Sequence, residues 1–246
     1  MMSLENKIVL VTGASRGIGA ATALACAKAG ASVLPHATGM SDSAAGVAGQ
    51  LETDFLFEDL SDDGAGGRLF QAALQRAGRI DAVVNNAGIY LPSPMSGSGW
   101  EEGWARTFAV NVQAPADICR AAVAHYRDRR EEGTVVNIAS RAGHRGDGPD
   151  HAAYAASKGA ILAMTKTWAR ALAGEGIHFY AIAPGWVETR MAPEDIKKRA
   201  EAVSDIPLGR VAQPDEVAAM TVFLLSGACP SSVGATFDIN GASYVR

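Results

Sequence analysis

Cysteine is scarce in this sequence, and the three that occur, Cys26, Cys119 and Cys229, lie far apart. An odd and widely spaced set does not make a disulfide framework, and no CxxC pair or close group of histidines and cysteines suggests a metal site. Long apolar runs are missing too, because no stretch approaches the roughly 18 apolar residues of a membrane span. The apolar run IVLV near the N-terminus is too short for a signal peptide. These absences predict a cytoplasmic protein that binds no metal and no membrane.

A basic excess is also absent, since 22 Lys and Arg stand against 26 Asp and Glu and give a net charge of −4. That balance argues against a dedicated nucleic-acid binder. With 48% hydrophobic and 20% charged residues, the chain has the composition of a globular protein that can bury a core. Glycine is abundant at 27 residues but lacks the repeat of collagen, so we expect the glycines in loops.

Short β-rich segments alternate with helical segments along the chain. Several predicted strands are continuous apolar runs, which are typical of strands covered on both faces in a parallel sheet. We expect strands at 7–12, 31–36, 54–57, 80–84, 134–139, 176–182 and 236–240, helices at 17–29, 68–77, 100–130 (interrupted at Pro115), 154–173 and 214–225, and a loop with a weak helix at 40–49. This order predicts an α/β fold, a Rossmann-type doubly wound parallel seven-stranded sheet with helices on both faces, as a single domain over residues 1–246.

The first predicted strand ends in a glycine-rich turn, TGASRGIG at residues 12–19. Gly13 permits a tight turn, Gly17 lets the backbone approach a pyrophosphate, and Gly19 lets the next helix pack close to the strand. The free N–H groups and the positive dipole at the helix N-terminus favour phosphates. Glycine spacing alone also fits a turn that only packs, but its place between a strand and a helix favours a nucleotide site.

Tyr154 and Lys158 are four residues apart and share one face of a predicted helix. A phenol, with a pKa near 10, is a poor base at neutral pH, and a nearby ammonium group would lower that pKa. Ser140, at the end of the fifth predicted strand, can donate a hydrogen bond to a substrate oxygen. Taken alone, such a Tyr–Lys pair more often belongs to a solvated helix face.

Six motifs in one order make the chain resemble the short-chain dehydrogenase/reductase family over nearly its whole length. They are TGASRGIG at 12–19, DL at 59–60, NNAG at 85–88, Asn111 within AVNVQAP, YAASK at 154–158 after Ser140, and PGWVET at 184–189. The resemblance implies that hydride passes between a nicotinamide cofactor and a carbonyl carbon while Tyr154 protonates the oxygen. It implies catalytic roles for Asn111, Ser140, Tyr154 and Lys158, with Asn111 holding a water on a proton path from Lys158. It also implies cofactor binding by Gly13, Ser15, Arg16, Gly17, Ile18, Gly19, Thr38, Asp59, Leu60, Asn86, Ala87, Gly88, Tyr154, Lys158, Pro184, Gly185, Val187 and Thr189.

The resemblance also bears on the choice of cofactor. Members that prefer NAD carry an Asp at the end of the second strand, where this chain has Ala37. Arg16 in the glycine turn is a cation that suits a 2′-phosphate, although it could instead be a surface residue. No Arg or Lys follows the second strand, only His36. We therefore expect NADP(H) in preference to NAD(H).

The substrate is expected to be a small carbonyl or alcohol, held by residues 89–100, 139–153 and a lid at 189–207. A 3-oxoacyl reductase-like activity is favoured, because the resemblance is closest to those members at TGASRGIG and at the HAT segment, 36–38. Arg141, His144, Arg145 and His151 could favour an acidic substrate, or could belong to a solvated loop or a subunit contact. The spacing from Ser140 to Tyr154 is one residue longer than the resemblance leads us to expect, which puts the loop conformation in question.

Two other functions stay open at this point. One is an NAD-dependent sugar, polyol or alcohol dehydrogenase. The other is a nucleotide-binding regulatory protein without turnover, against which the complete set of Asn111, Ser140, Tyr154 and Lys158 argues. The family is usually tetrameric or dimeric, so the resemblance implies a homotetramer or homodimer built through helices 100–130 and 154–173.

Overall fold

Seven parallel strands form one sheet in the order β3-β2-β1-β4-β5-β6-β7. The computed structural model describes residues 2–96, 98–189, 200 and 203–245. The strands are β1 (Ile8–Val11), β2 (Ser32–Ala37), β3 (Leu56–Phe57), β4 (Ala82–Asn85), β5 (Gly133–Ile138), β6 (Ile177–Pro184) and β7 (Thr236–Ile239). The predicted doubly wound sheet of seven strands is confirmed. The strand order changes direction beside β1, where an open α/β sheet forms its ligand crevice.

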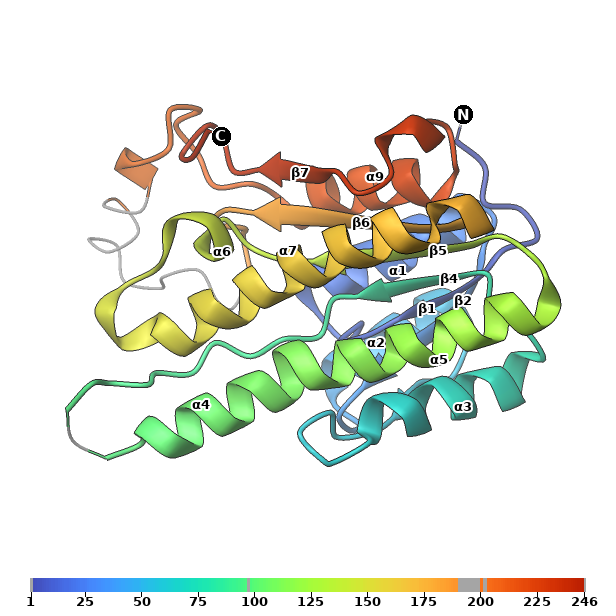
Figure 1. The fold of residues 1–246 in the computed structure, drawn as a ribbon, viewed down its shortest axis with the longest axis horizontal. Coiled ribbons are helices and arrows are strands. Elements are labelled where there is room, and N and C mark those ends of the chain that lie inside the picture. The colour runs from blue at the N-terminus through green and yellow to red at the C-terminus, as the bar shows by residue number, and fades with distance from the viewer. Residues whose placement is uncertain (1, 97, 190–199, 201–202, 246) are drawn as a thin grey trace.

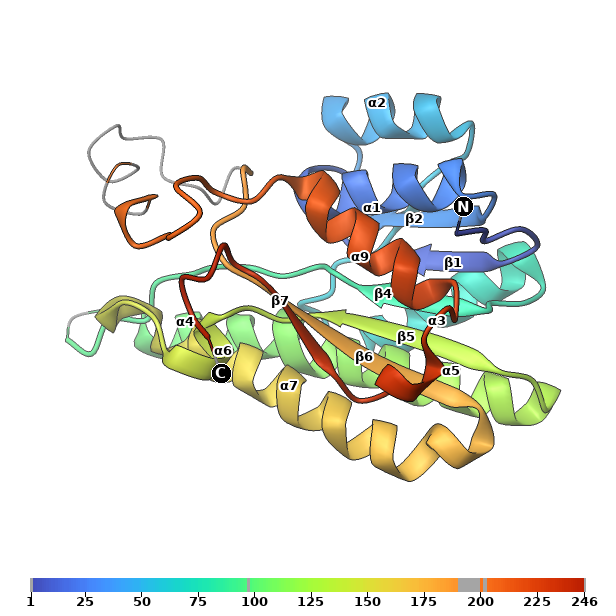
Figure 2. The ribbon, with the colours of Figure 1, turned by 90° about the horizontal axis from the view of Figure 1, so that it is seen from above.

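Helices cover both faces of this sheet. They are α1 (Gly17–Lys28), α2 (Asp42–Leu51), α3 (Ala65–Ala77), α4 (Trp100–Phe108), α5 (Ala114–Arg129), α6 (Ala142–Arg145), α7 (Ala152–Leu172) and α9 (Pro214–Leu225). Figure 1 shows the strand arrows pointing toward one end of the molecule, and Figure 2 shows α1, α2 and α9 on one side of the sheet with α7 and α5 on the other.

The continuous apolar strands feed two separate cores. In β1, Val9 and Val11 pack into the core beneath α1 and α9, whereas Leu10 between them packs into the core beneath α3, α5 and α7. All three side chains are fully buried. Strands covered on both faces cannot alternate between apolar and polar residues, which explains the unbroken apolar runs of the sequence.

Two predicted segments differ in the structure. Residues 40–49, expected as a loop with a weak helix, lie mostly in α2, because the Ser41 hydroxyl accepts a hydrogen bond from the Ala44 N–H and caps the helix. The interruption expected at Pro115 lies just before it, as a π-helical turn over Ala109–Gln113. Pro115 itself occupies the first turn of α5, where a missing N–H costs no helical hydrogen bond.

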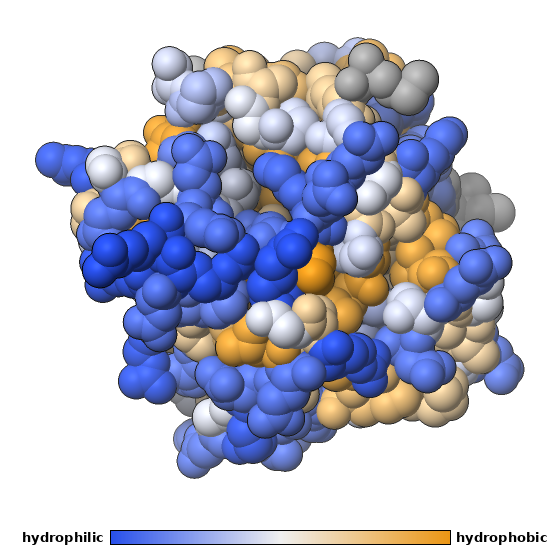
Figure 3. Space-filling model, turned by 90° about the vertical axis from the view of Figure 1, so that its right-hand side faces the viewer, coloured by the Kyte–Doolittle hydropathy of each residue, from blue (hydrophilic) through white to orange (hydrophobic). Residues whose placement is uncertain are grey.

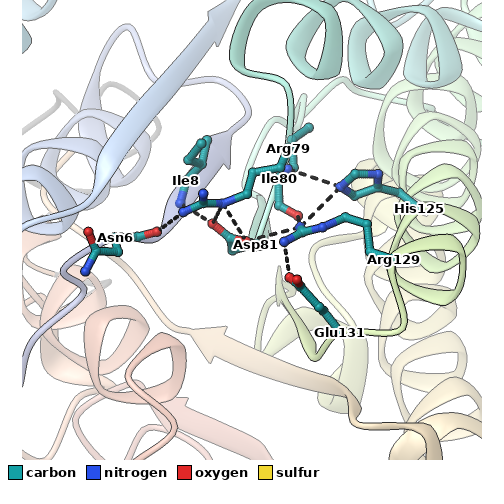
Figure 4. A network of polar contacts seen from close by, with 8 residues as sticks. All are labelled: Asn6, Ile8, Arg79, Ile80, Asp81, His125, Arg129 and Glu131. Atoms are coloured by element: carbon teal, nitrogen blue, oxygen red, sulfur yellow. Dashed lines mark hydrogen bonds and ion pairs between the residues drawn. The ribbon is translucent and has the colours of Figure 1, made fainter.

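A polar network ties β1, β4 and α5 together at the amino ends of the strands (Figure 4). The Asp81 carboxylate accepts hydrogen bonds from the Ile8 N–H at 2.7 Å and from the guanidinium groups of Arg79 and Arg129. Burial alone would raise the pKa of Asp81, but these donors outweigh it and hold that pKa below its usual value. Figure 3 views this end of the molecule, where hydrophilic side chains cover much of the surface.

The expectations of no membrane span and of a lid at 189–207 concern segments outside the sheet. None of the helices in the described ranges combines the length and the apolar character needed to cross a bilayer. Most of the predicted lid, residues 190–199 and 201–202 of 189–207, lies outside the described residues.

Helices α3 and α5 pack so closely at Gly66 that they leave no room for a side chain there. A Cβ at Gly66 would lie 2.2 Å from the Ala114 carbonyl oxygen, whereas a Cβ at the next residue, Gly67, would meet no atom within 4 Å. We expect Gly66→Ala to lower the free energy of unfolding by about 1–3 kcal/mol through overpacking. Gly67→Ala, the matched control, should raise it by up to about 1 kcal/mol. Urea denaturation measures both, and equal effects would contradict this packing.

Candidate active site

One large cavity of about 1110 Å³ opens over the carboxyl ends of β1, β2, β4, β5 and β6. Every residue predicted to bind the cofactor lines it, and so do Ser140, Tyr154 and Lys158. Asn111 does not line it and lies behind the wall, 1% exposed. The fold thus brings residues from 13 to 189 to one edge of the sheet, where an open α/β sheet binds its ligands.

The glycine turn fits a dinucleotide phosphate. Gly13 and Gly17 have φ of +64° and +56°, a left-handed conformation that favours glycine. A Cβ at Gly19 would lie 2.2 Å from the Gly13 carbonyl oxygen, so a side chain there would push the helix off the turn. The N-cap residue of α1, Arg16, makes no side-chain capping bond in the described structure. The helix therefore directs uncapped N–H groups and its positive dipole end into the cavity.

Hydrogen bonds with the two residues that follow β4 fix the shape of this turn. The Asn86 side-chain amide donates to the carbonyl oxygens of Thr12, at 2.8 Å, and Gly13, at 3.2 Å. The Thr12 hydroxyl oxygen in turn accepts from the N–H groups of Asn86 and Ala87. Asn86 therefore lines the cavity while its side chain braces the turn.

His36, the one basic-type side chain that the sequence places at the end of the second strand, is held in the neutral form by its surroundings. The ring is 1% exposed, and its Nδ1 accepts a hydrogen bond from the Gly13 N–H at 3.2 Å. Its Nε2 lies 3.0 Å from the Glu58 carbonyl oxygen, to which it donates. Burial lowers the pKa of His36, although the Glu58 contact and the Glu58 and Asp59 carboxylates oppose that shift. Because Nδ1 is an acceptor, the ring is neutral and holds the turn.

One end of the cavity lies near the ends of β1, β2 and β3. Arg16 and Thr38 are exposed at its rim, and β2 ends at Ala37, where no acidic side chain stands. The Asp59 carboxylate accepts from the Ser61 N–H and hydroxyl at 2.9 and 2.7 Å, which lowers its pKa. The neighbouring Leu60 is buried and supplies an apolar wall.

Lys158 carries a buried ammonium group. Its side chain is 5% exposed, and Nζ donates to the Ile138 carbonyl oxygen at 2.9 Å, at the end of β5. Burial lowers the pKa of Lys158 to about 8. An ammonium has three N–H donors and this bond uses one, so the others are available to a ligand in the cavity.

Tyr154 lies one helical turn before Lys158, with the Lys158 Nζ 5.8 Å from its ring centre. Burial raises the pKa of Tyr154 to about 12; a hydrogen bond with the Ser140 hydroxyl opposes this, and Asp147 adds to it. The lowered phenol pKa expected from the sequence is therefore not found in this state, because desolvation outweighs the hydrogen bond. Ser140 and Tyr154 nevertheless meet, so the longer connecting loop leaves their pairing intact.

Asn111 sits in the π-helical turn and joins the segments behind the cavity. Its side-chain amide donates to the Ile89 carbonyl oxygen at 3.0 Å and to the Ser157 hydroxyl at 3.1 Å, and its Oδ1 accepts from the Ile89 N–H at 2.8 Å. A Cβ on Gly88 would lie 3.3 Å from that Oδ1 and 3.4 Å from the Lys158 Nζ. A side chain at 88 would therefore press against the Asn111 amide oxygen and contact the Lys158 ammonium group.

The segment after β6 closes the cavity on the far side of the glycine turn. A Cβ at Gly185 would lie 2.9 Å from the Asn240 side chain, and the Gly185 N–H donates to the Ile239 carbonyl oxygen. Val187 is buried and pairs with Ala212, and the Thr189 side chain approaches Gly17.

Several residues of the site gave no clear signal in the sequence. Ser157 links Asn111 to the Tyr154 carbonyl oxygen, and Tyr90 packs edge-on against Tyr154 with ring centres 4.8 Å apart. Tyr90 also stacks on His151 at 3.9 Å. Ser157 could have been found inside the YAASK motif, but the contacts of Tyr90 join segments far apart in sequence. Within the described ranges, no cluster of His, Cys, Asp and Glu could hold a metal ion.

Comparison with known proteins agrees with this geometry. The family profile described as enoyl-(acyl-carrier-protein) reductase matches residues 13–241. The chain belongs to the short-chain dehydrogenase/reductase family. It is therefore an oxidoreductase of that family.

Similar short-chain dehydrogenases/reductases differ in their substrates. The 3-oxoacyl-[acyl-carrier-protein] reductase of Thermotoga maritima is 36% identical, over 99% of this chain and 100% of the relative. The galactitol 2-dehydrogenase of Agrobacterium fabrum is 34% identical with the same coverage. A solved structure described as a 2-deoxy-D-gluconate 3-dehydrogenase from Agrobacterium tumefaciens, with bound NADP, is 32% identical with a TM-score of 0.89, covering 100% of this chain and 99% of that one.

The neutral His36 ring predicts an acid sensitivity. Its folded pKa lies below the value of about 6.5 in an unfolded chain, so its contribution to stability is complete above that pH and is lost as the pH falls below it. We expect urea denaturation to show wild type losing up to about 1.4 kcal/mol more per pH unit than His36→Gln below about pH 6.5. The glutamine keeps an acceptor for the Gly13 N–H and has no titrating ring. Parallel pH dependences in the two proteins would contradict the assigned neutral ring.

Proposed function

We propose that this short-chain dehydrogenase/reductase interconverts a carbonyl and a secondary alcohol with NADP(H), using Tyr154 as the acid and base. The observation that carries the proposal is the group of Ser140, Tyr154 and buried Lys158 in the cavity that the glycine turn also lines. When bound, the nicotinamide cofactor supplies or accepts the hydride. The protein supplies position and the proton.

Each catalytic side chain has a task that its contacts support. The Ser140 hydroxyl donates to the substrate oxygen and holds it beside the Tyr154 phenol. In the reductive direction Tyr154 gives its proton to that oxygen, and a pKa of about 12 keeps the phenol protonated at neutral pH. Lys158, held on the Ile138 carbonyl oxygen, donates its remaining N–H groups to a cofactor ribose. Asn111 uses its side-chain amide to hold Ile89 and Ser157 in place behind Lys158. We keep a water beside Asn111, on a proton path from Lys158, as part of the proposal.

The cofactor preference rests on charge at the adenosine side. Arg16 is an exposed cation whose side chain makes no hydrogen bond or ion pair within the described residues. The last residue of β2 is Ala37, so no carboxylate stands at that position. A guanidinium group with free donors suits a 2′-phosphate, which a carboxylate at position 37 would repel. We therefore keep NADP(H) over NAD(H) as part of the proposal.

Two substrate classes follow. A 3-oxoacyl thioester is the first, supported by the relative from Thermotoga maritima. A sugar, polyol or sugar acid is the second, and a specific observation favours it: Arg141, Arg145 and Asp147 line the cavity together with Ser140 and Tyr154. A panel of oxoacyl thioesters, sugars, sugar acids and small ketones, followed by absorbance of the reduced nicotinamide, separates the two.

The remaining expectations stay proposals. We infer one domain over residues 1–246, whose own loops supply the substrate pocket, and a cytoplasmic homotetramer or homodimer. Light scattering measures the assembly state, and a monomer would contradict that part.

Removing the phenol tests the catalytic assignment. We expect Tyr154→Phe to lower kcat by about 10²–10⁴-fold, because a positioned acid of this kind contributes that much. NADPH affinity, measured by fluorescence titration, should stay close to wild type because Phe keeps the ring. Undiminished turnover in the variant would show that the enzyme does not use Tyr154 as its acid and base.

Removing the guanidinium tests the cofactor assignment. We expect Arg16→Ala to raise the KM for NADPH by about 10–100-fold, the loss of a charge-assisted hydrogen bond to the 2′-phosphate. The KM for NADH should hardly change, and Arg16→Lys should fall between wild type and Ala. A lower KM for NADH than for NADPH in the wild type would sink the NADP(H) preference.

A further inference from the structure

Arg141 carries a buried cation at the substrate end of the cavity. It follows Ser140 directly, and its N–H donates to the Pro184 carbonyl oxygen at 2.9 Å, which fixes it where β5 and β6 end. The residue is 8% exposed and lines the cavity that also holds Ser140 and Tyr154. Adjacent Cα atoms are about 3.8 Å apart, so whatever the Ser140 hydroxyl holds lies close to residue 141.

The guanidinium of Arg141 has one nitrogen, Nη1, without a hydrogen-bond partner among the described residues. Its Nη1 is shielded from solvent and reaches no hydrogen-bond acceptor in the described structure, where Arg141 also forms no salt bridge. Other arginines differ in this respect, because Arg68, Arg127 and Arg210 each hold a carboxylate oxygen at 2.6–2.7 Å while being about half exposed. A buried charge without a partner is unfavourable, so this group fits the protein only if a ligand or water completes it.

Two carboxylates stand near Arg141 without pairing with it. Burial and the neighbouring Arg145 both lower the pKa of Arg141, while Asp147 and Asp205 act in the opposite direction from beyond salt-bridge range. Asp147 is engaged elsewhere, since it makes a side-chain hydrogen bond with Tyr90. Asp205 is the competing partner within the protein, and a test has to separate it from a ligand.

We propose that Arg141 binds a carboxylate group of the substrate, so that the enzyme acts on hydroxy acids and oxo acids. The inference deepens the proposed function and rests on it for the reaction itself. A guanidinium offers parallel N–H donors that match both oxygens of a carboxylate. Because Arg141 lines the same cavity as Ser140 and Tyr154, we place the anionic group in the part of the substrate that shares this cavity with the reacting carbon. A thioester carried on a long phosphorylated arm has no anion there, which favours a small acid over an acyl thioester.

Matched pairs of substrates isolate the charge. D-gluconate and D-glucitol differ at one end, carboxylate against hydroxymethyl, and 3-hydroxybutanoate differs from its methyl ester in the same way. With NADP+ as oxidant, we expect kcat/KM of wild type to be higher for the acid of a pair. Arg141→Met should lower kcat/KM for the acid by about 10–100-fold, mainly through KM, and leave the neutral partner nearly unchanged. Arg141→Lys should restore part of the preference for the acid.

Two control variants test the alternatives. Arg106 also lines the cavity but is exposed, so Arg106→Met should not change the preference for acids. Asp205→Asn removes the competing carboxylate and should leave acid binding intact. If Asp205→Asn instead cancels the Arg141→Met defect in the double variant, Arg141 serves only to pair with Asp205 and the proposal is overturned. Equal losses for acid and neutral substrates in Arg141→Met would likewise show a structural role.

A binding measurement keeps the proposal independent of turnover. In isothermal titration of the NADP+ complex, we expect D-gluconate or 3-hydroxybutanoate to bind wild type, and to bind Arg141→Met about 10–100-fold more weakly. Absence of saturable binding of either acid to wild type overturns the proposal, and so does tighter Arg141-dependent binding of inorganic phosphate. If the acids bind through Arg141 but no member of the substrate panel is turned over, the proposed function fails while the carboxylate site stands.

Discussion

The hydrogen bond from the buried Lys158 ammonium to the Ile138 carbonyl oxygen is the contact on which the substrate end of the site depends. It joins α7 to the end of β5 through two residues that are 20 positions apart in the chain. Since Tyr154 lies one turn before Lys158 on α7, and Ser140 lies two residues after Ile138, this bond also sets the position of Tyr154 relative to Ser140. The ammonium is desolvated by the same packing, and its pKa falls to about 8 as a result. The Lys158 ammonium group is therefore held in place to interact with a ligand in the cavity.

Hydrogen bonds between side chains and the backbone have the same role around the glycine turn. The Asn86 side-chain amide donates to the Thr12 carbonyl oxygen, and the Asn86 N–H donates to the Thr12 hydroxyl oxygen. The His36 ring accepts a hydrogen bond from the Gly13 N–H. None of these contacts uses the N–H groups at the start of α1, so a phosphate can take them. The two ends of the cavity are thus alike. Hydrogen bonds within the protein hold the backbone in place, while N–H groups of Lys158 and of the start of α1 stay available to a ligand. In the proposed carboxylate site, Arg141 has the same role toward the substrate.

Local patterns predicted a large part of this arrangement. Apolar runs located all seven strands, and the glycine turn was placed between β1 and α1 as found, because these features depend on residues close together in sequence. The ends of elements were less accurate, as with β3, which has two residues instead of four. The role of His36 and the burial of Arg141 could not be predicted, since they depend on long-range contacts such as the one between Gly13 and His36, 23 residues apart. The raised pKa of Tyr154 likewise follows from desolvation, which only packing reveals.

The ionisation of Tyr154 tests most directly whether buried charge prepares this site for proton transfer. Phenolate absorbance can be titrated with pH in wild type and in Tyr154→Phe, each with and without NADP+, and the difference between the two proteins isolates one phenol. We expect that phenol to titrate near pH 12 in the free protein. In the NADP+ complex it should titrate at a clearly lower pH, because a cationic ring beside it favours the phenolate. The same titration with and without NADP+ would contradict the use of Tyr154 as acid and base.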